Sequence, residues 1–86
     1  MDRKDVYKII DTERAYQEKR HENHNNPHRD EDHSIADWLI YMKVHIRRAE
    51  SHLYVLDKKQ ALDELRKVTA LGVACMENNE TRPRIS

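Results

Sequence analysis

The chain of 86 residues contains little cysteine, no long apolar run and no excess of either charge. Its single cysteine, Cys75, excludes an intramolecular disulfide, and no apolar signal segment follows the opening Met-Asp-Arg-Lys. The longest nearly apolar stretch, residues 68–76, is far shorter than the roughly 20 residues of a transmembrane helix. We therefore expect a soluble protein in a reducing cytoplasm, which is the host cytoplasm if a phage encodes the chain.

The charge composition is balanced, with 16 acidic and 16 basic residues, and the mean hydropathy is −1.07. Double-stranded nucleic acid binds through many phosphate contacts along a basic face, so it is not expected as a ligand. Any electrostatic function must come from local placement of charge. A chain this short buries a small core, and we therefore expect a homodimer or higher homo-oligomer.

Apolar periodicity predicts an all-α fold with three helices in a single domain over residues 1–86, and no strand. Val6, Ile9 and Ile10 recur at helical spacing and predict a helix with a thin apolar face over 2–22. Residues 23–33 contain Pro27 and no apolar side chain, so a polar loop is expected there.

A long central helix is predicted over 35–56, because Ser34 and Asp37 form a capping-box pattern directly before an apolar-periodic run. The predicted core seam of this helix consists of Ile35, Trp38, Leu39, Met42, Ile46, Ala49, Leu53 and Leu56. Asp57 can cap a third helix over 58–77, followed by a tail over 78–86. The short connection favours an antiparallel hairpin, with a kink between collinear helices as the alternative. An antiparallel helical bundle completed by oligomerisation follows.

The third helix carries small residues around Gly72, and glycine in a helix interior costs about 1 kcal/mol relative to alanine. The close approach of another helix would account for a glycine at this position. Cys75 lies on the apolar side of this helix, where we interpret it as a core residue rather than a nucleophile. Trp38 and Met42 are interpreted as packing residues in the same way.

The strongest candidate site is a polar stripe beside the apolar seam, made of Tyr41, His45, Arg48 and His52. These positions are separated by four, three and four residues, so their side chains share one side of a helix. A guanidinium suits phosphate, imidazoles add donors, and an aromatic ring can stack on a base, so the stripe would suit a nucleotide. A solvated helix with a basic polar flank is the alternative interpretation.

Three segments, over residues 13–20, 33–39 and 61–77, resemble small phage and bacterial MazG-like proteins, the all-α nucleotide pyrophosphohydrolases. They read Glu-Arg-Ala-Tyr-Gln-Glu-Lys-Arg, His-Ser-Ile-Ala-Asp-Trp-Leu and Ala-Leu-Asp-Glu-Leu-Arg-Lys-Val-Thr-Ala-Leu-Gly-Val-Ala-Cys-Met-Glu. The resemblance implies a helical oligomer that binds nucleoside polyphosphates through magnesium, held by a Glu-x-x-Glu pair and a Glu-x-x-Asp pair. It spans most of the chain, from residue 13 to residue 77, as a diffuse pattern.

The positions that match the acidic pairs depart from that pattern. The first pair falls on His45 and Arg48, and the second falls on Glu64 and Lys67, so only Glu64 is acidic. Cations at these positions would repel magnesium, and without the ion the hydrolytic mechanism is in doubt. No catalytic residue, metal ligand or cofactor is therefore assigned. In an alignment shifted by one turn, acids would come instead from Glu50, Asp57, Asp63 and Glu64.

These replacements lead to a hypothesis of non-catalytic binding, in which cations contact an anionic nucleotide or nucleotide-derived immune signal directly, as in a phage anti-defence sponge. The candidate ligand-binding residues are Tyr41, His45, Arg48, His52, Glu64, Arg66, Lys67, Arg14, Gln17, Arg82 and Arg84. The tail arginines can equally be a solvated tail, and Arg14 and Gln17 an exposed helix face. The alternative functions are a magnesium-dependent nucleoside triphosphate pyrophosphohydrolase and a helical protein–protein interaction module.

Four histidines, His21, His24, His28 and His33, gather around the polar loop. Imidazoles can ligate zinc or nickel, but the spacings match no familiar site. We interpret them as surface histidines, with a metal site as the alternative.

Overall fold

The computed structural model describes residues 1–23 and 32–85, with side chains described for 1–20 and 32–85. The described chain is all-helical, with α1 spanning Arg3–Asn23, α2 spanning Ile35–Tyr54 and α3 spanning Lys58–Glu77. The all-α prediction is confirmed for this part of the chain, and the expected loop histidines His24 and His28 lie outside it. No helix among the described residues is long and apolar enough to cross a membrane.

The start of α2 has the capping box that the sequence predicts. The Ser34 hydroxyl accepts a hydrogen bond from the Asp37 amide at 3.1 Å, and the Asp37 carboxylate accepts one from the Ser34 amide at 2.9 Å. Two backbone donors that would otherwise lack partners are thereby satisfied at the first turn. The cap fixes where the α2 helix begins.

The end of α2 is a tight turn that reverses the chain into α3. Leu56 adopts φ 61°, its amide donates to the Leu53 carbonyl at 2.9 Å, and the Asp57 amide donates to the His52 carbonyl at 2.9 Å. This pair of bonds is a Schellman motif, and it ends α2 at Tyr54 rather than at the predicted residue 56. Asp57 then caps α3 by accepting from the Gln60 amide at 3.1 Å.

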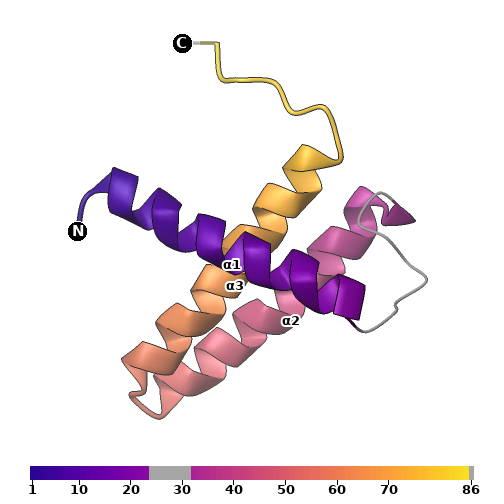
Figure 1. Ribbon diagram of the computed structural model, residues 1–86. Coiled ribbons are helices and arrows are strands. Elements are labelled where there is room, and N and C mark those ends of the chain that lie inside the picture. The colour runs from indigo at the N-terminus through magenta and orange to yellow at the C-terminus, as the bar shows by residue number, and fades with distance from the viewer. Residues whose placement is uncertain (24–31, 86) are drawn as a thin grey trace.

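Helices α2 and α3 form an antiparallel hairpin, and α1 lies across one face of it against α3 (Figure 1). The buried apolar core of the described chain is small and consists of Trp38, Val68, Ala70 and Ala74. At Gly72 an added Cβ would lie 3.5 Å from the Met42 methyl, which is an ordinary contact distance, so the long Met42 side chain of α2 reaches this glycine.

The predicted seam of α2 is only partly buried. Trp38 is buried and Met42 and Ala49 are half-buried, but the seam residues on one flank are exposed: Ile35, Leu39, Ile46, Leu53 and Leu56. The prediction of a core position was wrong for these five in the single chain. The side of α2 that packs against α3 is thus narrower than the apolar side of α2, and the remaining apolar residues are exposed.

Helix α1 buries two charged residues more completely than its thin apolar face, of which Ile10 is half-buried. Glu13 and Arg14 are buried, whereas Val6 and Ile9 are exposed. Asp2 caps this helix, because its carboxylate accepts from the Asp5 amide at 3.0 Å. Two ion pairs, Arg14 with Glu77 and Glu13 with Arg66, therefore form part of the contact between α1 and α3.

Candidate functional site

The polar stripe of α2 lies on the flank opposite the exposed apolar residues. Its four members sit on one helix face, with His45 and His52 half-buried and Tyr41 and Arg48 exposed. Within the described chain, the side chains of Arg48 and His52 have no hydrogen-bond or ion-pair partner. The stripe thus presents one cation and one imidazole without an internal polar contact.

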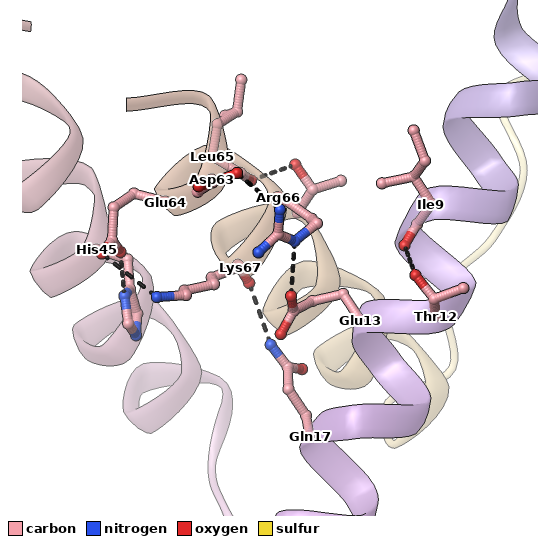
Figure 2. A network of polar contacts seen from close by, with 11 residues as sticks. Ile9, Thr12, Glu13, Gln17, His45, Asp63, Glu64, Leu65, Arg66 and Lys67 are labelled. Carbon is pink, nitrogen blue, oxygen red and sulfur yellow. Dashed lines mark hydrogen bonds and ion pairs between the residues drawn. The ribbon is translucent and has the colours of Figure 1, made fainter. Parts of the chain in front are cut away.

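His45 is held by a buried carboxylate on the neighbouring helix. Its Nδ1 lies 2.7 Å from Oε2 of Glu64, and the Lys67 Nζ lies 3.5 Å from Oε1 of the same carboxylate (Figure 2). Glu64 is 7% exposed, so this is a charged group that the hairpin removes from water. His45, Glu64 and Lys67, three of the four positions that the sequence resemblance aligns with metal-binding acids, therefore meet in one cluster.

The ionisation of Glu64 is favoured by this arrangement. Burial alone would raise the pKa of Glu64, but the hydrogen bond with His45 and the charge of Lys67 together hold it below its ordinary value of 4.5. The carboxylate is consequently ionised at neutral pH. One negative charge of the cluster is balanced by Lys67.

A second cluster joins α1 to α3 beside the first (Figure 2). The Arg66 Nε donates to Oε1 of buried Glu13 at 2.7 Å, and its NH1 donates to Asp63 at 2.9 Å. The hydrogen bond to Glu13 raises the pKa of Arg66, and it outweighs the opposing effect of burial. Arg66 was predicted as a ligand-binding residue, but in the structure its side chain links α3 to α1 through Glu13.

Gln17 links the two clusters through the backbone. Its side-chain nitrogen donates to the Lys67 carbonyl at 3.4 Å, while its Oε1 is buried and has no partner among the described residues. A buried amide oxygen without a donor costs free energy, on the order of 1–3 kcal/mol. The Gln17 Oε1 is therefore an unpaired acceptor in the interior, next to the turn of α3 that contains Lys67.

Arg14 is also a structural residue in the described chain. It is buried and forms ion pairs with Glu18 at 2.9 Å and with Glu77 at 3.2 Å. The second pair joins the middle of α1 to the last turn of α3. Arg14 therefore does not lie on an exposed helix face, which was the alternative interpretation of the sequence.

The tail arginines lie away from the stripe. Arg82 and Arg84 are exposed, and the tail extends beyond the C-terminal end of α3, away from the three helices (Figure 1). The structure does not bring them together with Tyr41, His45 or Arg48.

Sequence reasoning missed an aromatic cluster at the start of α2. His33 packs edge-on against Trp38 and Tyr41, with ring centroids 5.2 and 5.4 Å apart, and Trp38 and Tyr41 are 6.4 Å apart. The Trp38 Nε1 is buried and has no partner in the described chain. The spacing of Trp38 and Tyr41, three residues apart on one helix, was the available signal. Tyr41 is thus anchored at the end of the stripe.

The acids that an active hydrolase would need are distributed among structural contacts. Asp57 caps α3, Asp63 pairs with Arg66, and Glu64 pairs with His45 and Lys67, whereas Glu50 is exposed on the other flank of α2. Within residues 1–20 and 32–85, no group of three His, Cys, Asp or Glu side chains is placed to hold a metal ion. Among the described residues, these acids are therefore in structural contacts or lie apart from one another.

Comparison of the chain with protein-family models, with curated proteins and with solved structures finds no match.

Proposed function

We propose that this chain binds an anionic nucleotide, or a nucleotide-derived immune signal, without turning it over. In this proposal it is a MazG-like helical scaffold whose α2 stripe takes the place of a metal site. The phosphates would contact Arg48, with His45 and His52 as further donors and the Tyr41 ring beside the base. Such binding without chemistry corresponds to a sponge that removes a signal from the host cytoplasm.

The observation that supports this proposal is the balance of charge around Glu64. Its carboxylate is neutralised by Lys67 and hydrogen-bonded to His45, so the remaining cation of the stripe, Arg48, keeps its charge for an external partner. Arg48 is exposed and has no polar partner in the described chain. A guanidinium in this state can form paired hydrogen bonds with a phosphate.

The same balance argues against hydrolysis through magnesium. Mg²⁺ takes oxygen ligands and tolerates no ammonium group in its coordination shell, yet Lys67 lies 3.5 Å from the Glu64 carboxylate. A metal ion would have to displace Lys67 and His45 from that carboxylate. Direct ionic binding of the ligand requires no such rearrangement.

Titration calorimetry against linear and cyclic nucleotides, with EDTA or with magnesium, tests the proposal. We expect binding in EDTA, no phosphate or pyrophosphate release, and a loss of affinity of about tenfold or more in Arg48→Ala, because hydrogen bonds to charged groups contribute about 1.5–3 kcal/mol. The matched control is Arg47→Ala, since Arg47 is a neighbouring exposed arginine on another face of α2. Its affinity should not change.

The absence of binding across the panel would refute the proposal, as would equal losses in the Arg47 and Arg48 variants. Magnesium-dependent product release would instead support the pyrophosphohydrolase. We also propose that the working form is a homo-oligomer, because the apolar core of one chain is small. A symmetric assembly would present the stripe once in each copy.

A further inference from the structure

The hairpin carries an apolar face that no part of the described chain covers. Six side chains that are 43–64% exposed make up this apolar face: Leu39, Ile46, Leu53, Leu62, Leu65 and Met76. The first three follow the flank of α2 opposite the polar stripe, and the others follow the flank of α3 away from its contacts with α1. Because α2 and α3 are antiparallel, the two flanks come together on the face of the hairpin that α1 leaves open (Figure 1).

The accessible surface of the whole chain is larger than that expected for a compact monomer of its mass. Its accessible surface is 7429 Å², whereas a folded monomer of 10.4 kDa exposes about 5400 Å². The extended tail contributes part of the excess of roughly 2000 Å², but half of it would exceed the roughly 800 Å² per partner of a standard interface. The apolar face is one part of this exposed area, because its six side chains are 43–64% exposed.

The apolar face has the spacing of a helix that pairs with its own copy. Leu39, Ile46 and Leu53 recur every seven residues, as in helices that pack side by side. In an antiparallel pairing centred on Ile46, Leu39 would lie opposite the partner's Leu53, and Ile46 would meet its own counterpart. The His45–Glu64 bond places Leu65 at the same level of α3. Both helices therefore have an apolar residue at the centre.

The charges that border the apolar face are complementary in the same arrangement. Lys43 and Glu50 lie along its outer edge on α2, are exposed, and have no polar partner within the described residues. They stand at nearly equal distances on either side of Ile46, so antiparallel pairing brings each Lys43 beside the partner's Glu50. A parallel pairing would place like charges together.

We propose that the apolar face is a homodimer interface, in which two hairpins pack about a two-fold axis beside Ile46 and form a four-helix bundle. A second copy fits this face in apolar spacing and in charge. The polar stripe of α2 lies on the opposite flank and remains outside the interface. The inference therefore stands independently of nucleotide binding, and each can fail without the other.

Disulfide trapping tests the axis directly on the full chain. In a Cys75→Ser background, Ile46→Cys should cross-link to its counterpart under mild oxidation, because equivalent residues beside a two-fold axis come within disulfide reach. Arg47→Cys is the matched control, since its side chain points away from the apolar face, and it should stay monomeric on non-reducing gels. Equal cross-linking of the two variants, or none at Ile46, would overturn the proposal.

Charge reversal tests the register and requires no change in the apolar face. Lys43→Glu should raise the dimer dissociation constant about tenfold in sedimentation velocity, because two symmetry-related pairs become repulsive. The double variant Lys43→Glu/Glu50→Lys should restore it, and Arg47→Glu should leave it unchanged. A wild-type chain that stays at 10.4 kDa at high concentration, assembles beyond a dimer or shows no rescue would overturn the proposal.

Discussion

Replacing Glu64 with glutamine removes one negative charge from the centre of the hairpin while keeping the shape of the side chain. The wild-type carboxylate is 7% exposed and lies 2.7 Å from His45 and 3.5 Å from Lys67. A short hydrogen bond to a buried charged group contributes about 1.5–3 kcal/mol, whereas a longer pair with a partly exposed lysine contributes under about 1 kcal/mol. We expect Glu64→Gln to lower the free energy of unfolding by about 2 kcal/mol.

Urea denaturation followed by circular dichroism, at one fixed protein concentration, measures this loss. In a chain of this size the expected change corresponds to a fall in Tm of about 10 °C. Asp11→Asn is the control, because Asp11 is an exposed carboxylate on α1 with no polar partner in the described chain, and its effect should stay within about 0.5 kcal/mol. An equally small effect at Glu64 would refute the role assigned to the buried cluster.

The pH dependence of the same variant follows from the sign of the pKa shift. The pKa of Glu64 in the folded chain lies below its ordinary value of 4.5, so the unfolded chain takes up a proton first as pH falls. The stabilisation is present above pH 4.5 and is lost as pH decreases through the lower folded-state pKa. The stability difference between wild type and Glu64→Gln should therefore shrink in that window, and a constant difference would contradict this reasoning.

Three further substitutions test the packing and the turn by urea denaturation. Gly72→Ala should stabilise the chain by about 1 kcal/mol, because the added methyl meets only the flexible end of Met42 at an ordinary contact distance of 3.5 Å; destabilisation would mean that the helices cannot accept it. Leu56→Gly should also stabilise it, by roughly 1 kcal/mol, since exposed Leu56 has φ 61° and glycine adopts this conformation without strain; a loss would show that Leu56 is packed. Arg14→Ala should cost about 1–2 kcal/mol, because it removes the buried Arg14 side chain together with its pairs to exposed Glu18 and Glu77, and a neutral result would contradict the packing of Arg14 between α1 and α3.

The helices could be predicted from the sequence because their limits are set by local chemistry. Ser34 and Asp37 form a capping box, and Asp57 caps α3, whatever the rest of the chain does. The left-handed Leu56 was not predictable in the same way, since leucine carries no preference for that conformation. That turn accounts for the two residues by which the prediction overran the end of α2.

The burial of individual residues could not be predicted as well as the helices. Periodicity indicated that Ile46 and Leu53 share an apolar face with Trp38, but it does not show which partner covers which part of that face. Trp38 is covered by the rest of the chain, whereas Ile46 and Leu53 are exposed in the single chain.

The candidate site was predicted only along one helix at a time. The spacing of His45 and Arg48 placed both on one side of α2, because helical periodicity is a local property. The bond between His45 and Glu64 joins residues 19 positions apart, and its existence depends on how α2 and α3 are aligned. Sequence patterns within a single helix contain no information about that alignment.

The length of the turn between Tyr54 and Lys58 has a consequence for how this chain can vary. An inserted residue would separate left-handed Leu56 from the cap residue Asp57, so the bond from the Asp57 amide to the His52 carbonyl would have to be made by another residue. Asp57 has two roles in this turn, since its carboxylate also caps α3 by accepting from the Gln60 amide. Length changes should therefore cost more stability here than in the exposed C-terminal tail.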